Sequence, residues 1–240
     1  LTRLEGYGGG RITNANLTVN IGDSQAYQGR FDGPGTITKS GLGTWRLYGN
    51  SSLFEGSFTL QNGTIEIGHN NALGVKSNVV LYLDGGALVP VDSSRDLYVD
   101  YVLRGDVTLG AAEHATNNLN LKAGSAGTFT LEGAYTITVP GAATALVFAT
   151  VTDGANAFGL TKAGTGMLRL QSDNSFDGEV IVHEGRLEIR APFALGTTNA
   201  GTIVRNGASL RIQGVDLDLW EPLTLSGLGT SSGPNNGALV

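Results

Sequence analysis

The sequence predicts an all-β protein built as a β-solenoid. Three observations lead to this fold class: nearly every segment alternates apolar and polar residues, Gly, Asn or Asp bounds each short run, and one long segment occurs twice. No window of helical length carries an apolar stripe with a 3.6-residue period. We therefore expect a stack of about ten coils, with residues 1–240 forming a single solenoid domain.

Composition narrows the class of protein. The chain has 240 residues, 37 of them Gly, no Cys and a formal net charge of −6. Its length can bury a large core, and the many glycines predict tight turns. The scattered Lys and Arg residues and the acidic balance argue against nucleic-acid binding, and the lack of Cys excludes disulfides and thiolate metal sites.

The two ends of the chain suggest part of something longer. No signal peptide stands at residue 1, and the only Met is Met167. Neither "LTRLEGYGGG" nor "SSGPNNGALV" resembles an amphipathic cap for a solenoid. We expect a processed or excised piece, either flanked by more repeats or stacking end to end.

The repeated segment organises the chain. "TITKSGLGTWRLYGNSS" (36–52) aligns with "GLTKAGTGMLRLQSDNS" (159–175), and "FEGSFTLQNGTIEIGHNNALG" (54–74) aligns with "FDGEVIVHEGRLEIRAPFALG" (176–196). Leu53 is the one inserted residue between the aligned parts. A weaker match, "GGAL" against "GASL", extends the two copies to 36–88 and 159–210.

Short alternating runs place the strands along the chain. In order they are "TWRLYG", "TIEIG", "VVLYLDGG", "NLNLKAG", "TFTLEG", "TITVPG", "MLRLQS", "EVIVHEG", "LEIRA" and "SLRIQG". Trp45 and Leu47 share one strand face and Arg46 takes the other, as stacked coils require. With three strands and ~20 to 25 residues per coil, and ~4.8 Å between coils, the rod would be about 50 Å long.

The two copies resemble the autotransporter-associated β-strand repeat. The resemblance rests on the positions shared with its pattern: Lys39/Lys162, Gly41/Gly164, Gly43/Gly166, Phe54/Phe176, Gly56/Gly178, Gly63/Gly185 and the Ala-Leu-Gly endings at 72–74 and 194–196. It implies a secreted, right-handed parallel β-helix of the kind found in autotransporter passengers and other exported surface proteins. It implies nothing specific about activity.

Lys39 and Lys162 stand in "TKSGLG" and "TKAGTG", the segments most like an anion-binding loop. A phosphate loop needs a following helix and a Gly-Lys-Ser/Thr order, and neither is present. We expect both lysines at solvated corners of the coils.

Acidic pairs are the candidates for catalysis, because parallel β-helices also host enzymes that degrade pectin. They are Asp96/Asp100, Asp173/Asp177 and Asp216/Asp218/Glu221. There is no Asp-Asp pair or Asn-x-Asp run of the kind seen in those hydrolases, so solvated turns are the favoured interpretation. We expect no catalytic residues.

Metal and cofactor sites are not expected either. His69, His114 and His183 are far apart in the sequence, without zinc spacing, and we expect them at the surface. The calcium-binding nonapeptide is also absent.

Two further sets of residues bear on the surface. Arg46/Arg169 and Glu66/Glu188 recur on outward strand faces and predict charge ladders. Tyr98, Tyr101 or Trp220, if exposed on one face, would signal a glycan-binding module.

These observations favour a non-enzymatic structural or adhesive stalk of an exported bacterial surface protein. Its expected partners are neighbouring repeats, further copies of itself in filaments, or host and matrix glycans or proteins, with no nucleic acid and no membrane insertion. A β-helix enzyme acting on carbohydrate and a glycan-binding module remain the alternatives.

Overall fold

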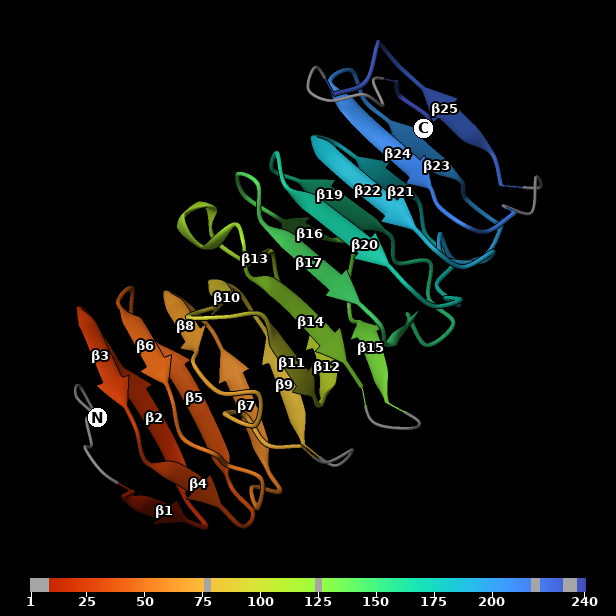
Figure 1. Cartoon of the computed structure of the whole chain (residues 1–240). Helices are drawn as coiled ribbons and strands as arrows, with labels where there is room; N and C mark the ends of the chain where they lie inside the picture. The colour runs from red at the N-terminus through yellow and green to blue at the C-terminus, as the bar shows by residue number, and fades with distance from the viewer. Residues whose placement is uncertain (1–8, 76–78, 124–126, 217–220, 231–236) are drawn as a thin grey trace.

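The computed structural model describes residues 9–75, 79–123, 127–216, 221–230 and 237–240. Within these ranges the chain forms 25 β-strands and one short 3₁₀ helix, η1 (Ala112–His114). Figure 1 shows the strands stacked as a rod that runs from β1 and β4 at one end to β25 at the other. No helix in this part of the chain has the length and apolar character needed to span a membrane.

The strands form three long sheets, in which every recorded pairing is parallel. The ten-stranded sheet contains β3 (Ser24–Tyr27), β6 (Thr44–Leu47), β8 (Thr64–Ile67), β10 (Ala87–Pro90), β13 (Val107–Leu109), β16 (Tyr135–Thr138), β19 (Leu160–Ala163), β21 (Val180–Val182), β23 (Thr202–Val204) and β25 (Leu223–Leu225). The seven-stranded sheet contains β2 (Asn16–Asn20), β5 (Thr36–Ser40), β7 (Ser57–Leu60), β9 (Val80–Leu83), β12 (Asp100–Leu103), β15 (Thr128–Leu131) and β18 (Thr150–Thr152).

The six-stranded sheet forms the third long face. It contains β11 (Arg95–Tyr98), β14 (Asn118–Lys122), β17 (Thr144–Val147), β20 (Met167–Leu170), β22 (Gly185–Ile189) and β24 (Ala208–Ile212). A separate pair, β1 (Arg11–Thr13) with β4 (Arg30–Asp32), lies near the N-terminal end.

The predicted solenoid is confirmed, with about nine turns. Successive coils differ in length: Arg46 contacts a residue 20 positions on, whereas Asp106 contacts one 30 positions on. The longest of these spacings exceeds the expected 20 to 25 residues because the coil contains the η1 segment. Central coils have three strands, while those of the two sequence repeats have two strands and a loop.

The core consists of one apolar face from each strand. Trp45 and Leu47 are buried as expected, and they stack on Ile65 and Ile67 of the next coil. Phe31, Phe54 and Phe58 form an aromatic cluster with Trp45 near the N-terminal end, with edge-to-face contacts of 5.1 to 6.4 Å between ring centroids. Burying each such side chain contributes about 1.5–3 kcal/mol, so these stacks supply the driving force for coiling.

The two sequence copies lie on different faces of the rod. In the first copy, β5 belongs to the seven-stranded sheet and β6 to the ten-stranded sheet, but the matching strands β19 and β20 belong to the ten-stranded and six-stranded sheets. Along the seven-stranded sheet, β5 is followed by β7, β9, β12, β15 and β18, and the chain then enters β19. The second copy is therefore displaced from the first by five coils along the rod and by one face around it.

Candidate functional site

The repeated lysines are buried inside the corners of the coils. Lys39 and Lys162 both have 0% exposure, which contradicts the predicted solvated positions. The Lys39 ammonium donates to the carbonyls of Ser40 (2.9 Å), Gly41 (2.8 Å) and, in the next coil, Asn62 (3.1 Å).

Lys162 repeats this arrangement on another face. Its Nζ donates to the carbonyls of Ala163 (2.9 Å), Gly164 (2.7 Å) and Glu184 (3.0 Å). Each lysine thus closes its own turn and links it to the next coil. With three acceptors per ammonium, no donor is left for a phosphate.

The sequence does contain a signal for this burial. Lys39 follows the buried Ile37 by two residues, and Lys162 follows the buried Leu160 by two, so alternation places both lysines on the inward side. The general preference of Lys for solvent obscured that signal.

Burial changes the acid–base behaviour of both amines. Desolvation lowers the pKa of Lys39 and that of Lys162 from 10.5 to about 8, since the charged form loses its hydration. The three carbonyl acceptors hold the ammonium that remains at neutral pH.

The first acidic pair is divided between two faces of the rod. Asp96 lies on β11 of the six-stranded sheet, whereas Asp100 lies on β12 of the seven-stranded sheet. Burial opposes ionisation of Asp96, but hydrogen bonds from Lys122 (2.8 Å) and Asn120 (2.6 Å) lower its pKa. Burial raises the pKa of Asp100. The pair does not face a common cleft.

Asp173 and Asp177 hold loops between neighbouring coils. Asp173 accepts from the backbone N–H of Phe193 at 2.9 Å. Asp177 accepts from the Thr197 hydroxyl at 2.5 Å and the Asn199 amide at 2.9 Å. Both carboxylates thus stabilise turns. The solvated-turn interpretation did not include these hydrogen bonds to the loop of the neighbouring coil, which hold the loops more closely than a tolerant surface turn requires.

The third acidic group is only partly described. Asp216 is exposed, Asp218 lies outside the described residues, and Glu221 is buried with its carboxylate accepting from the Thr202 hydroxyl at 2.8 Å. Burial raises the pKa of Glu221.

The histidines are separate from one another. His183 is exposed, while His69 and His114 are half-buried. His69 accepts through Nδ1 from the backbone N–H of Asn71 at 3.0 Å, and burial lowers its pKa. Within the described ranges, no three side chains of His, Asp or Glu are grouped so as to hold a metal ion.

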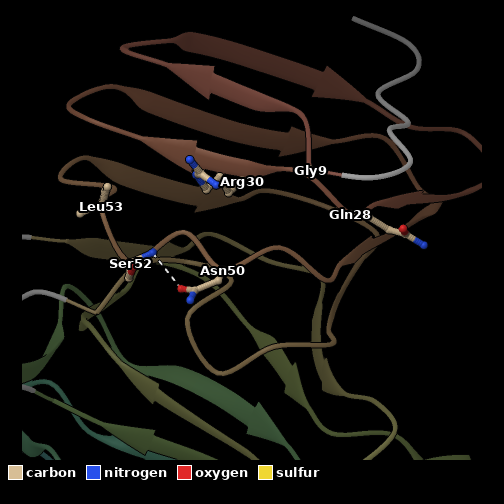
Figure 2. Close-up of a pocket in the computed structure, with 6 residues that line it drawn as sticks. All are labelled: Gly9, Gln28, Arg30, Asn50, Ser52 and Leu53. Carbon is tan, nitrogen blue, oxygen red and sulfur yellow. Dashed lines mark hydrogen bonds between the residues drawn. The ribbon is translucent and has the colours of Figure 1, made fainter.

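A hollow of about 220 Å³ lies beside β4 (Figure 2). Its lining residues are Gly9, Gln28, Arg30, Asn50, Ser52 and Leu53. Asn50 Oδ1 accepts from the backbone N–H of Ser52 at 3.2 Å, which is the dashed line in Figure 2. Arg30, the charged residue of this lining, is already paired with Asp32 at 3.1 Å. The described residues of this lining offer polar groups that could contact a ligand, but none of them is a carboxylate for acid–base catalysis.

The recurring charges form the predicted ladders on outward faces. Arg46 pairs with Glu66, and Arg169 pairs with Glu188 at 2.6 Å. The carboxylates are more deeply buried than outward positions suggest: Glu188 has 0% exposure, because arginine side chains cover it.

The three candidate aromatics do not line one face. Tyr98 is 38% exposed, but Tyr101 is fully buried, with its hydroxyl donating to the Leu97 carbonyl at 2.6 Å. Tyr101 follows Val99, another buried residue, by two positions, so alternation turns its ring inward. Trp220 lies outside the described residues.

Comparison with known proteins bears on the repeated segment. The family model of the passenger-associated transport repeat matches residues 37–67 and 160–189. The chain contains two passenger-associated transport repeats. Each includes one buried corner lysine and one Arg–Glu ladder.

A curated relative supports the same assignment. The adhesin BmaC autotransporter of Brucella suis biovar 1 (strain 1330) is 36% identical over 108 residues. The match covers 45% of this chain and 3% of that protein. No solved structure matches the chain significantly. The transport repeats and this relative together indicate an exported β-helical passenger segment.

Proposed function

We propose that this chain is a rigid, non-enzymatic segment of a bacterial cell-surface protein, which spaces and presents adhesive contacts outside the cell. The observation that carries the proposal is the pair of transport repeats built into continuous parallel ladders from β3 to β25. Every coil is hydrogen-bonded to its neighbours, which stiffens the rod and leaves the outward side chains free to contact partners.

The adhesive part of the proposal is supported by the relative from Brucella suis, which is named as an adhesin. The match covers 3% of that protein, so its name alone does not assign adhesion to this segment. We infer adhesion from the similarity and from the outward side chains that the rod leaves free to contact partners. The partners we propose are host or matrix molecules, and further copies or repeats of the same kind.

Adhesion can be tested with beads coated with the purified chain. We expect them to attach to cultured epithelial cells more than beads coated with the heat-denatured chain. Attachment equal to that of the denatured control would contradict an adhesive role and leave a spacer role alone.

The enzymatic alternative is less favoured because the candidate carboxylates are engaged in loops and ladders. Asp96 pairs with Lys122, while Asp173 and Asp177 accept hydrogen bonds from neighbouring coils. We expect no turnover of pectic or other acidic glycans. Turnover that is lost in Asp173→Asn or Asp216→Asn would overturn the non-enzymatic proposal.

A further inference from the structure

Positive charge gathers on the outer side of the six-stranded sheet, around the second transport repeat. We call this surface the arginine face, and define it by the outward residues of β20, β22 and β24 and those that directly follow: Arg169, Arg186, Glu188, Arg190 and Arg211. In Figure 1 these strands lie side by side in the C-terminal half of the rod.

One carboxylate serves three guanidinium groups on this face. Glu188 contacts Arg169 at 2.6 Å and Arg190 at 2.9 Å through Oε1. Its Oε2 contacts Arg211 at 3.3 Å. The carboxylate is fully buried, whereas the Arg190 and Arg211 side chains are 36% and 28% exposed. Among the described residues, this cluster therefore has two more positive charges than negative ones.

Arg186 adds a further cation. It lies on β22, two residues before Glu188, and its Nε has no hydrogen-bond partner among the described residues. The arginine face is thus basic on a chain whose formal net charge is −6.

The first repeat shows that folding does not require this excess. There Arg46 and Glu66 form a one-to-one pair on the ten-stranded sheet. Gly68 and Val89 stand at the positions that Arg190 and Arg211 occupy in the second copy. Arg190 and Arg211 thus belong to the second copy alone, which indicates a role in binding rather than in folding.

Exposed aromatic rings continue the same surface toward the middle of the rod. Tyr98, Lys122 and Phe148 occupy neighbouring strands or strand ends, with the Lys122 ammonium 5.6 Å from the Tyr98 ring and 5.2 Å from the Phe148 ring. Tyr98 is 38% exposed and Phe148 37%.

Backbone hydrogen bonds carry this column on to Arg190. They link Phe148 to the β14 strand, Gln171 to β17 and Arg190 to β20. The Arg190 guanidinium also donates to Gln213 Oε1 at 2.8 Å. From Tyr98 to Gln213 the column crosses six strands, about 24 Å at ~4.8 Å per strand.

From this surface we infer that the chain binds an anionic polysaccharide along the arginine face and the adjoining aromatic column. Guanidinium groups bind sulfate and carboxylate with charge-assisted, bidentate hydrogen bonds. Aromatic rings flanking a cation offer an apolar platform for sugar rings. The cations follow one another along the rod axis, which suits an extended polymer with repeated negative charges. This inference rests on the proposed adhesive function and names the chemical class of its ligand.

Heparin is the probe for this binding, measured by titration calorimetry on the intact chain. The test variant is Arg190→Gln/Arg211→Gln, which reduces the second repeat to the one-to-one pair found in the first. The matched control is Arg46→Gln, because Arg46 holds the same place in the first repeat as Arg169 in the second.

We expect heparin to bind the wild-type chain and the double variant to bind about tenfold more weakly or worse, since it loses two charged contacts. Arg46→Gln should bind within about twofold of wild type, and added salt should weaken binding most where the arginines are intact. Far-ultraviolet circular dichroism and the urea midpoint check that each variant is folded. Arg186→Gln, which breaks no recorded ion pair, provides a second variant with the same expected direction.

Three results would overturn the inference: no heparin binding by the wild type, equal loss in Arg46→Gln, or binding of single-stranded DNA of similar length as tightly as heparin. Neutral dextran should not bind.

The coated-bead assay separates this inference from the proposed function. Beads with the double variant that still attach as well as wild type disprove the glycan ligand and leave adhesion standing, whereas wild-type beads that never attach contradict adhesion itself.

Discussion

The corner lysine is the residue that most distinguishes this solenoid from a simple stack of apolar strands. Lys39 and Lys162 place a charged amine where an aliphatic side chain would be expected, and each amine joins two coils through three backbone carbonyls. An unpaired buried carbonyl is costly, so the lysine and the turn it closes depend on each other. The lysine's recurrence in both transport repeats follows from this structural role.

Replacing a corner lysine by Met should destabilise the chain. Met fills similar space but donates no hydrogen bond, so we expect Lys39→Met and Lys162→Met each to lower the free energy of unfolding by about 2 kcal/mol. Urea denaturation measures the change. Lys122→Met, which removes a partly exposed ion pair with Asp96, should cost under about 1 kcal/mol. Equal effects at all three positions would contradict the role of the corner lysines.

The corner lysines also predict a pH dependence. Their pKa is about 8 in the folded chain against 10.5 for an ordinary Lys. Between these values the unfolded chain binds more protons, so the contribution of each lysine to the free energy of unfolding rises with pH in this window and is constant below it. Burial also raises the pKa of Tyr101, but wild type and the Met variants share that effect.

The measurement is the difference in free energy of unfolding between wild type and each Met variant from pH 7 to pH 10. We expect it to grow above about pH 8. An NMR titration of the Lys39 and Lys162 side chains with midpoints near 10.5 would disprove the shift.

At the scale of the element, the backbone at the corner between two strands packs directly on the backbone of the preceding coil. A Cβ added at Gly63 would lie 2.5 Å from the carbonyl oxygens of Gly41 and Gly43 and 2.8 Å from the Lys39 amine. Gly185 stands in the same relation to Gly164 and Gly166, at 2.4 and 2.7 Å. Gly63 and Gly185 are therefore required by the close approach of the preceding coil.

Substituting these glycines should be costly for two reasons. Gly63 and Gly185 have φ values of +67° and +69°, and the new methyl group would meet backbone that cannot move independently. We expect Gly63→Ala and Gly185→Ala each to lower the free energy of unfolding by about 2 kcal/mol or more. Gly22→Ala is the control, because nothing lies within 4 Å of its added Cβ. Urea midpoints for Gly63→Ala or Gly185→Ala equal to that of Gly22→Ala would contradict this account of the corner.

At the scale of the whole molecule, parallel ladders join coil to coil from one end of the rod to the other. In such an array each coil contacts its neighbours alone, so stability adds along the axis. A strand at either end of a ladder can pair with another chain unless it is covered. The self-association proposed above would use those ends.

Solution scattering and electron microscopy test the shape and this association. About nine coils at ~4.8 Å predict a particle about 43 Å along its axis, with larger species forming in multiples of that length as concentration rises. A particle that stays a monomer at every concentration would exclude filaments. It would leave the rod itself unaffected.

Local patterns were sufficient to predict the fold. Alternation identified the inward faces of strands such as Trp45–Leu47, and the corner glycines marked the turns, because both depend on neighbours within a few residues. The same rule places Lys39 and Lys162 inside, but the general preference of Lys for solvent argued for the surface and was wrong at these positions. Alternation does not identify the backbone carbonyls that accept hydrogen bonds from the buried lysines and make their burial tolerable.

The chain's order of residues was enough to establish coiling, its repeat and its inward faces, since these follow from side-chain period and backbone freedom. The number of coils between the copies was not readable, because coil length varies with loops such as η1. The second transport repeat is offset from the first by one face, so that its strands lie on the ten-stranded and six-stranded sheets. Packing of coils on the six-stranded sheet brings Arg169 and Arg211, each about 20 positions away in the sequence, to the buried Glu188, which Arg190 also contacts from two residues along the same chain segment.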